Sequence, residues 1–217
     1  MLLSEIKLPV RKSNTPISGA LMNKDIIGVG IQAIAYTHDK HPDSVIKTTS
    51  ITGENDPAYQ SLRLFYNHQD NPFFPKIYTY KVYPTRTLSK EEIKFLKSSH
   101  KLTLHGVPRQ KEFTLVVVME RLKPILSITD EEILKLFDEL GVIKYKGDID
   151  EFIRYKRIIR NRFENPYERE MLRLSPNKQF AQAIRLLEPL FRHHDADMHF
   201  GNLMLRGKQL VIMDPIT

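Results

Sequence analysis

Three residues near the carboxyl end of the chain have the types and spacing that metal-dependent chemistry uses. Asp197 is followed five residues later by Asn202, and Asp214 comes directly after an apolar run. Phosphoryl transfer from ATP uses one carboxylate to orient the acceptor hydroxyl, with an amide and a second carboxylate to hold Mg²⁺ against the phosphates. Mg²⁺ takes few protein ligands and keeps water and phosphate oxygens as the others, so two side chains suffice. These three residues fit that chemistry.

The residues between Asn202 and Asp214 predict a β-hairpin. Leu203–Leu205 and Leu210–Met213 are short apolar runs, and Gly207 lies in the turn between them. Two such runs joined by a short glycine-containing turn form paired antiparallel strands. The pairing would bring Asn202, at the start of the first strand, beside Asp214, at the end of the second.

Composition limits the class of protein. The 217 residues suffice for one large domain or two small lobes, and 41% hydrophobic with 27% charged residues is ordinary for a soluble globular protein. The chain contains no cysteine, which excludes disulfides and thiolate zinc sites and favours a reducing compartment. The net charge of +7 favours acidic partners such as nucleotides.

We expect a cytoplasmic protein that does not enter a membrane. No apolar run approaches the roughly 20 residues that a membrane-spanning helix needs. The amino terminus lacks a positively charged region followed by a long apolar segment, so it does not read as a secretory signal.

A second group of candidate residues lies in the first quarter of the chain. Residues 25–36 read as a strand, a glycine turn and another strand, with Gly28 and Gly30 at the turn and Lys47 on the strand that follows. Glycines let backbone amides approach a phosphate more closely than residues with side chains do. An ordinary hairpin bend with a surface lysine is the alternative interpretation.

Further elements follow in the first half. Asp56 reads as an N-cap with Pro57 at the first helical position, which predicts a helix that ends at Asn67. A turn followed by an alternating strand is predicted at 71–83, and a further strand at 113–119. The second of these is a continuous run dominated by β-branched residues, so it should be buried on both faces.

Residues 84–111 read as an insertion between two strands, with a short helix at 90–97. Lys123–Pro124 ends the strand pattern and marks the expected lobe boundary. The predicted organisation is an N-terminal arm at 1–24, an N-lobe at 25–122 that contains the insertion, and a helical C-lobe at 123–217.

The second half of the chain is predicted to be helical up to the hairpin. Thr129 begins a capping box, and the helix that follows should stop at Gly141. Further helices are predicted at 149–163 and 176–192, the last with a possible bend at Pro189. Strands first and helices second indicate the α+β class with two lobes.

Together these residues resemble the protein-kinase-like superfamily, which includes aminoglycoside phosphotransferases. The phosphotransferase loop has the pattern H-x-D-x-H-x-x-N, and residues 195–202 read Asp-Ala-Asp-Met-His-Phe-Gly-Asn. The motif sequences of this chain are more similar to those of the serine/threonine protein kinase domain of short-tailed (podovirus) phages than to those of the phosphotransferases. Those domains share Val-Ile-Lys on the lysine strand, Asp-Met-His-x-Gly-Asn-x-Met in the loop, and Asp-Pro after the last strand. The resemblance covers residues 25–83 and 113–217.

The resemblance implies a two-lobed protein-kinase-like fold, with an antiparallel-sheet N-lobe and a mainly helical, shortened C-lobe. It implies an ATP- and Mg²⁺-dependent kinase that phosphorylates alcohol groups, most closely a phage-type serine/threonine kinase acting on host proteins in the host cytoplasm. The expected partners are ATP and a protein substrate, and no nucleic acid is expected.

The resemblance also assigns roles to residues. Asp197 would be the catalytic base, and His199 would donate a hydrogen bond near the γ-phosphate. Asn202 and Asp214 would bind Mg²⁺. The residues implied to bind ATP, through its phosphates or through a hinge strand that faces adenine, are Gly28, Gly30, Lys47, Met119, Glu120 and Arg121.

The chain departs from the family pattern at several positions. The third glycine of the phosphate lid is Ala33, and the family histidine two residues before the base is Asp195, so we expect His194 to support the loop instead. The predicted helix at 57–67 contains no acid to pair with the lysine, and Glu54 is a poor match by spacing. Only three residues follow the last aspartate, so we expect no activation-loop phosphorylation.

Four alternatives stay open. A pseudokinase could use the same scaffold to bind a nucleotide or a protein, and a small-molecule kinase could share the phosphotransferase loop. His193, His194 and Asp195 resemble the metal ligands of HD-type phosphohydrolases, but such enzymes are helical throughout. The basic run at 154–162 is expected to be a solvated helix face, with a docking patch for an acidic partner as the alternative.

Overall fold

The computed structural model describes residues 25–29, 33–84, 112–147 and 152–216, and within them the protein is α+β, with five α-helices and antiparallel strands. The chain divides into two compact units. The first comprises the residues up to Tyr59 together with Lys76–Arg121, and the second comprises Gln60–Pro75 and everything from Leu122 onward. The predicted arm at 1–24, Gly30 and the helix at 90–97 lie outside the described residues.

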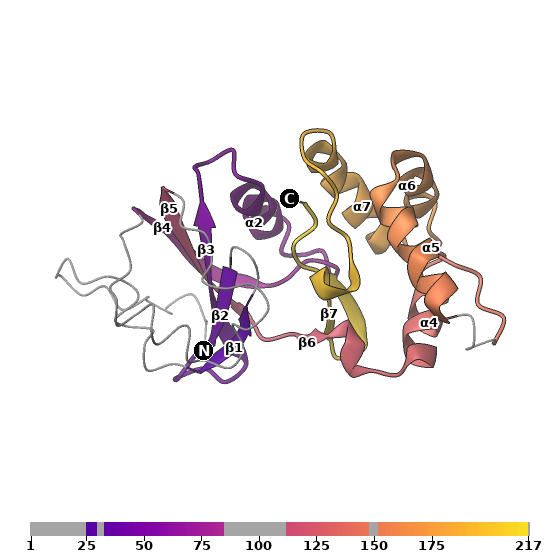
Figure 1. Cartoon of the computed structure of the whole chain (residues 1–217), viewed down its shortest axis with the longest axis horizontal. Coiled ribbons are helices and arrows are strands. Elements are labelled where there is room, and N and C mark those ends of the chain that lie inside the picture. The colour runs from indigo at the N-terminus through magenta and orange to yellow at the C-terminus, as the bar shows by residue number, and fades with distance from the viewer. Residues whose placement is uncertain (1–24, 30–32, 85–111, 148–151, 217) are drawn as a thin grey trace. The chain divides into compact units, whose positions relative to one another are not determined.

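The first unit is built on a five-stranded antiparallel sheet with the order β1-β2-β3-β5-β4 (Figure 1). Its strands are β1 (Ile26–Val29), β2 (Ala33–Thr37), β3 (Ser44–Ile51), β4 (Ile77–Pro84) and β5 (Phe113–Glu120). Every strand predicted in this half of the chain is present. The side chains of β5 are buried from Leu115 to Glu120, as its continuous apolar pattern predicted.

The register of this sheet sets Gly28 and Lys47 in one cross-strand row. Gly28 pairs with Ala35 of β2, and Ala35 pairs with Lys47 of β3. Partners directly opposite each other in an antiparallel sheet point to the same face. Ala35 lies between Gly28 and Lys47 in this row.

The helix α2 (Pro57–Asn67) begins and ends where the sequence predicted. Asp56 is buried, and its carboxylate accepts a hydrogen bond from the Ala58 N–H at 3.1 Å, as an N-cap does. The same carboxylate also accepts hydrogen bonds from the backbone N–H and the hydroxyl of Thr52, at 3.0 and 3.2 Å. Asp56 therefore fixes both the end of the preceding loop and the start of the helix.

The stretch Gln60–Pro75, which the sequence assigned to the N-lobe, makes its contacts within the second unit. Phe73 and Phe74 are each 1% exposed, and the Phe73 carbonyl accepts a hydrogen bond from the Ile212 N–H at 2.8 Å. The Arg206 guanidinium donates to the carbonyls of Pro72 and Phe74 at 3.0 and 2.9 Å. Two buried phenylalanines and four backbone groups thus tie this stretch to the C-terminal hairpin.

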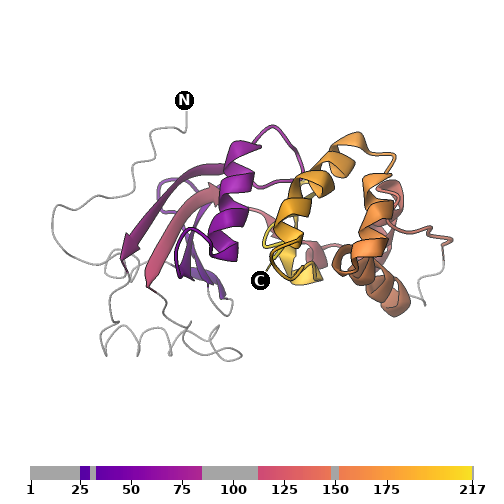
Figure 2. The same cartoon turned by 90° about the horizontal axis from the view of Figure 1, so that it is seen from above.

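Four helices of the second unit pack one against the next in chain order (Figures 1 and 2). They are α4 (Asp130–Glu139), α5 (Phe152–Glu164), α6 (Pro166–Arg173) and α7 (Lys178–Phe191). The capping box of α4 is present, with Thr129 and Glu132 exchanging hydrogen bonds, and Gly141 after the helix has a φ of +68°. The sequence analysis did not predict α6.

The core of the second unit is a series of aromatic rings. Phe73 lies 5.1 Å from Phe180, Phe180 lies 6.3 Å from Phe163, and Phe163 lies 6.4 Å from Phe137, measured between ring centroids. All four side chains are at most 1% exposed. These contacts join α4, α5 and α7 to the stretch before β4.

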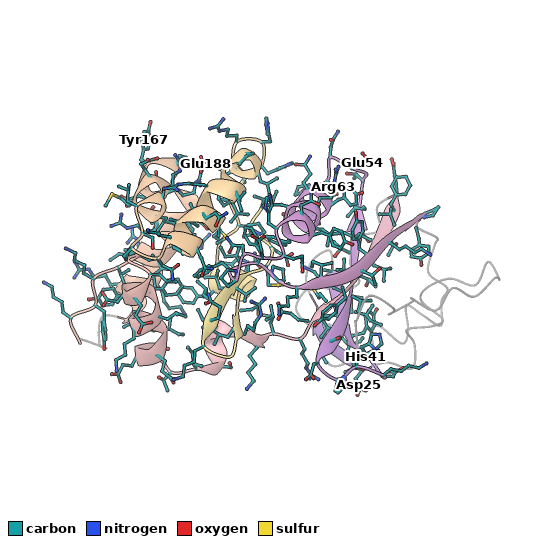
Figure 3. The ribbon with its side chains drawn as sticks, turned by 180° about the vertical axis from the view of Figure 1, so that it is seen from behind. Asp25, His41, Glu54, Arg63, Tyr167 and Glu188 are labelled. Carbon is teal, nitrogen blue, oxygen red and sulfur yellow. The ribbon has the colours of Figure 1, made fainter. Side chains whose placement is uncertain are left out.

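A buried arginine joins three of these helices. Arg169 of α6 donates to the carbonyls of Phe163 and Glu164 at the end of α5, both at 2.9 Å. Its guanidinium lies 4.5 Å from the centroid of the Phe191 ring and 3.8 Å from the carboxylate of Glu188, a residue of α7 that Figure 3 labels. Burial lowers the pKa of Arg169, and its partners keep the charged side chain in place.

The predicted hairpin at the end of the chain is confirmed. Its strands are β7 (Leu203–Arg206) and β8 (Gln209–Ile212), with Gly207 in the turn at a φ of +61°. The two-residue strand β6 (Lys123–Pro124) pairs with β7 to give a three-stranded sheet. Among the described residues, no helix combines the length and apolarity needed to cross a membrane.

Candidate functional site

In the loop between α7 and β7, the predicted base Asp197 and the predicted metal ligand Asn202 are in direct contact. The Nδ2 group of Asn202 donates to the backbone carbonyl of Asp197 at 2.7 Å and to its carboxylate Oδ2 at 3.2 Å. A primary amide has two N–H donors and one acceptor oxygen. With Nδ2 directed at Asp197, the oxygen of the amide is the atom left to ligate a cation.

The segment after β8 is held against this loop by its backbone. The Met213 N–H donates to the Asn202 carbonyl at 2.9 Å, and the Asp197 N–H donates to the Pro215 carbonyl at 2.8 Å. These two hydrogen bonds lie on either side of Asp214 in the chain. An isolated bridge between Ala196 and Ile216 extends the pairing. The structure therefore brings the backbone of Asp214 beside both Asp197 and Asn202, as the predicted hairpin requires.

His199 lies in the same loop, with one ring nitrogen toward the backbone and the other toward the carboxylate. Nδ1 accepts a hydrogen bond from the Gly201 N–H at 2.9 Å, and His199 is the N-cap of the 3₁₀ turn η4 (Phe200–Asn202). Nε2 lies 3.6 Å from Oδ1 of Asp197. This distance is too long for a hydrogen bond, but the two groups would form an ion pair if the ring were protonated.

The donor set of the loop fits a hard cation that needs few protein ligands. The oxygen of the Asn202 amide and the carboxylate of Asp214 are the oxygen donors that Mg²⁺ prefers. Both residues are partly exposed, which leaves room for the water and phosphate ligands of such an ion. Within the described part of the chain, no group of three or more histidine, aspartate and glutamate side chains could hold a metal by itself.

The residues predicted to bind ATP phosphates belong to the first unit. Lys47 is partly exposed in the interior of β3, and Gly28 lies two strands away in the same row. Among the described residues, a Cβ built on Gly28 would meet only the Cβ of Ala35 at 3.8 Å, which is ordinary contact. The sheet itself therefore does not require glycine at this position.

Two backbone N–H groups of the predicted hinge already form hydrogen bonds within the first unit. The Glu120 N–H donates to the Lys76 carbonyl at 3.0 Å, and the Arg121 N–H donates to the Asp43 carbonyl at 2.8 Å. The Glu120 side chain accepts from the Lys76 N–H at 2.7 Å. An adenine could use these two N–H groups only by replacing the present hydrogen bonds, while Met119 lies within the ladder of β5.

In the kinase family, the helix that corresponds to α2 carries an acid that pairs with the lysine at the position of Lys47. The residues of α2 include no acid. Glu54 is exposed and lies in the loop before this helix (Figure 3). His194, expected to support the catalytic loop, has Nε2 at 3.1 Å from Oε1 of Gln60 in α2. The backbone of the segment after β8 also contacts the loop, through the Met213 N–H and the Pro215 carbonyl.

Two features of this loop were not foreseen from the sequence. Gly201 supplies the N–H that binds His199, and Lys156 of α5 lies 5.2 Å from the centroid of the Phe200 ring. Lys156 belongs to the basic run that was expected to be a solvated face. Elsewhere in that run, Arg160 and Arg162 form ion pairs with Glu164 and Glu168, at 2.7 and 2.8 Å.

No protein-family model matches this chain, and no curated protein matches it. The functional interpretation therefore depends on the residues and their geometry.

Proposed function

We propose that this protein is an ATP- and Mg²⁺-dependent phosphotransferase that acts on alcohol groups, with a protein as the acceptor. The observation that carries the proposal is the orientation of Asn202, whose Nδ2 group is engaged by two oxygens of Asp197. That contact couples a candidate base to a candidate metal ligand. The backbone pairing of residues 213–216 with the loop supports Asp214 as the candidate for the second ligand.

Each residue would have a defined part in the reaction. Asp197 would accept a hydrogen bond from the acceptor hydroxyl and orient it toward the γ-phosphate. Asn202 and Asp214 would hold Mg²⁺, which neutralises charge on the phosphate oxygens. Because phosphoryl transfer depends mainly on positioning and electrostatic stabilisation, few other catalytic groups are needed.

In the first unit, Lys47 and the backbone at Gly28 would bind the phosphates of ATP. Lys47 supplies a cation, and glycine allows close approach of backbone N–H groups to anionic oxygens. We further propose that the acceptor is a serine or threonine hydroxyl of a host protein, as the phage-type resemblance implies.

The test is incubation of the purified protein with labelled ATP, Mg²⁺ and a cell lysate. Wild-type protein should label lysate proteins, and Asp197→Ala should lower labelling by roughly 10³-fold or more while retaining the fold. Asp195→Ala is the matched control, because this exposed aspartate lies two residues away and should be replaceable. Equal labelling by wild type and Asp197→Ala would refute the proposal.

A nucleotide- or protein-binding module without turnover is the second candidate. Two observations favour it, namely the lack of an acid in α2 and the internal hydrogen bonds of the Glu120 and Arg121 N–H groups. This candidate predicts ATP binding, or a biological effect, that persists in an Asn202→Ala, Asp214→Ala double variant. A phosphotransferase would lose its activity in that variant.

A small-molecule kinase would share the same loop chemistry. A panel of aminoglycosides and protein substrates, assayed with the same enzyme preparation, separates it from the protein kinase.

A further inference from the structure

The absence of a side chain at Gly201 leaves room for the imidazole ring of His199. The backbone conformation of Gly201 does not itself need glycine. Among the described glycines, positive φ angles occur at positions 53, 141, 147 and 207, and Gly201 is not one of them. A Cβ at Gly201 would lie 2.6 Å from Cε1 and 2.9 Å from Nδ1 of His199. Such distances are shorter than real contacts, so a side chain at 201 would displace the imidazole ring.

The same glycine fixes which ring nitrogen of His199 carries the proton. The Gly201 N–H donates to Nδ1 at 2.9 Å, so Nδ1 must be unprotonated in this arrangement. A neutral imidazole has one N–H, which then lies on Nε2. The ring is 46% exposed, and the hydrogen bond from the Gly201 N–H to Nδ1 is a contact that orients it.

The proton on Nε2 is directed at the candidate base. Nε2 lies 3.6 Å from Oδ1 of Asp197, while Oδ2 of the same carboxylate accepts from Asn202. The gap is slightly longer than a hydrogen bond, so the Nε2–H group can donate to an oxygen that binds beside Asp197. An oxygen of the transferring phosphoryl group or of the acceptor would occupy that place.

We propose that Gly201 is a positioning residue that holds His199 as a neutral Nε2–H donor aimed at the reacting oxygens next to Asp197. The inference rests on the proposed phosphotransferase function for its kinetic consequences, but not for the tautomer itself. It specifies that His199 acts as a fixed hydrogen-bond donor through Nε2. It also explains why a glycine with an ordinary backbone stands two residues after this histidine.

The first experiment measures the tautomer without any turnover. Nitrogen-15 NMR of the imidazole groups in the full-length protein, with His199→Gln used to assign the His199 signals, should show a neutral ring protonated at Nε2. In Gly201→Ala, the signals of this ring should shift toward those of a mobile exposed histidine. A wild-type ring protonated at Nδ1 would overturn the inference.

The second experiment is a double-mutant cycle on turnover. Removing one preorganised donor to a developing charge costs roughly 10²-fold in kcat. We expect Gly201→Ala and His199→Ala each to lower kcat by about this factor, with little change in the KM for ATP. The double variant should be no slower than His199→Ala alone, because Gly201 acts only through the ring. Additive losses would overturn the inference.

Conservative variants give an independent check. Glutamine places an amide N–H near the position of Nε2, whereas asparagine reaches only the position of Nδ1. His199→Gln should therefore retain most of the turnover, and His199→Asn should behave like His199→Ala. The opposite ranking would overturn the inference.

The outcomes separate this inference from the proposed function. If no variant or wild type transfers phosphate, the proposed function fails, and the NMR signature still tests the tautomer. If transfer depends on Asp197 but Gly201→Ala is as active as wild type, only the present inference fails. Circular dichroism of Gly201→Ala in the His199→Ala background shows that the glycine substitution is compatible with folding.

Discussion

Asn202 donates from one nitrogen to both the backbone carbonyl and the carboxylate of Asp197, at 2.7 and 3.2 Å. The contact joins the two ends of the six-residue segment 197–202, which begins with the candidate base and ends with a candidate metal ligand. It fixes the rotation of the Asn202 amide, because reversing the amide would set its oxygen against two acceptors. The contact thereby gives the Asn202 side chain a structural role in addition to its proposed role as a metal ligand.

Asn202→Ala should therefore have two effects that can be measured separately. The loss of the hydrogen bonds to Asp197 should lower the free energy of unfolding by about 1 kcal/mol, measured by urea denaturation without nucleotide. The loss of a metal ligand should raise the Mg²⁺ concentration needed for half-maximal phosphate transfer. An unchanged Mg²⁺ requirement would remove Asn202 from the proposed metal site.

Asp214→Asn should weaken metal binding while leaving the backbone pairing of the loop in place. The backbone hydrogen bonds on either side of Asp214 involve Met213 and Pro215 and do not depend on its carboxylate. Replacing the charged ligand with a neutral amide should weaken Mg²⁺ binding by about tenfold or more. Titration of activity with Mg²⁺ measures the shift, and a requirement equal to that of wild type would exclude Asp214 as a ligand.

Gly28→Ala separates a role in ligand binding from a role in the sheet. The new Cβ would make an ordinary 3.8 Å contact with the Cβ of Ala35, so stability should be unchanged or slightly higher. If the backbone at Gly28 approaches the phosphates of ATP, affinity for ATP should fall by about tenfold, the equivalent of one hydrogen bond. Calorimetric titration with ATP and a denaturation curve on the same preparation decide the matter. Unchanged affinity would leave Gly28 as a residue of the hairpin alone.

Local sequence signals predicted most of the elements. Asp56 and Pro57 specify the start of α2, and the capping box at Thr129 specifies the start of α4. The missed helix α6 has the same signal, since Asn165 accepts a hydrogen bond from the Tyr167 N–H and Pro166 is the first helical residue. The apolar pattern of this eight-residue helix is too short to predict it, but the Asn165-Pro166 pair is an N-cap signal that predicts its start.

The contacts that complete the site could not be read from the sequence. Residue types and hairpin spacing predicted that Asn202 and Asp214 would be neighbours in space. The support of the loop, however, comes from the Pro215 carbonyl, a backbone group that any residue could supply. Likewise, the attachment of Gln60–Pro75 to the second unit depends on long-range contacts of Phe73 with Phe180 and with Ile212. Propensity and local pattern carry no information about such partners.

Arg169 should be one of the residues most sensitive to substitution in the second unit. Arg169→Met would leave two carbonyls at the end of α5 without their buried donor, while Glu188 would keep its ion pair with Arg173 at 2.9 Å. Leaving a buried acceptor without a donor typically costs about 1–3 kcal/mol. Arg160→Met is the matched control, because this exposed arginine forms only a surface pair with Glu164 and should cost at most about 0.5 kcal/mol. Similar urea midpoints for the two variants would show that the buried contacts of Arg169 contribute little to stability.

The capping box of α4 should make part of the stability dependent on pH. The backbone N–H of Thr129 donates to the Glu132 carboxylate at 2.8 Å, and this bond, with that from the Thr129 hydroxyl, lowers the pKa of Glu132. Because the folded-state pKa is the lower one, the stabilisation is complete above the ordinary pKa of a glutamate. It is lost as the pH falls through the lowered value in the folded protein.

Glu132→Gln keeps an acceptor oxygen but has no charge to lose. The difference in denaturation midpoint between wild type and this variant should therefore be largest near neutral pH. It should shrink as the pH is lowered through the glutamate range, since protonation removes the advantage of the carboxylate. Glu139→Gln, at the other end of the same helix, controls for the loss of one surface charge. A midpoint difference that stays constant from neutral to acidic pH would show that the charge of Glu132 contributes nothing to the cap.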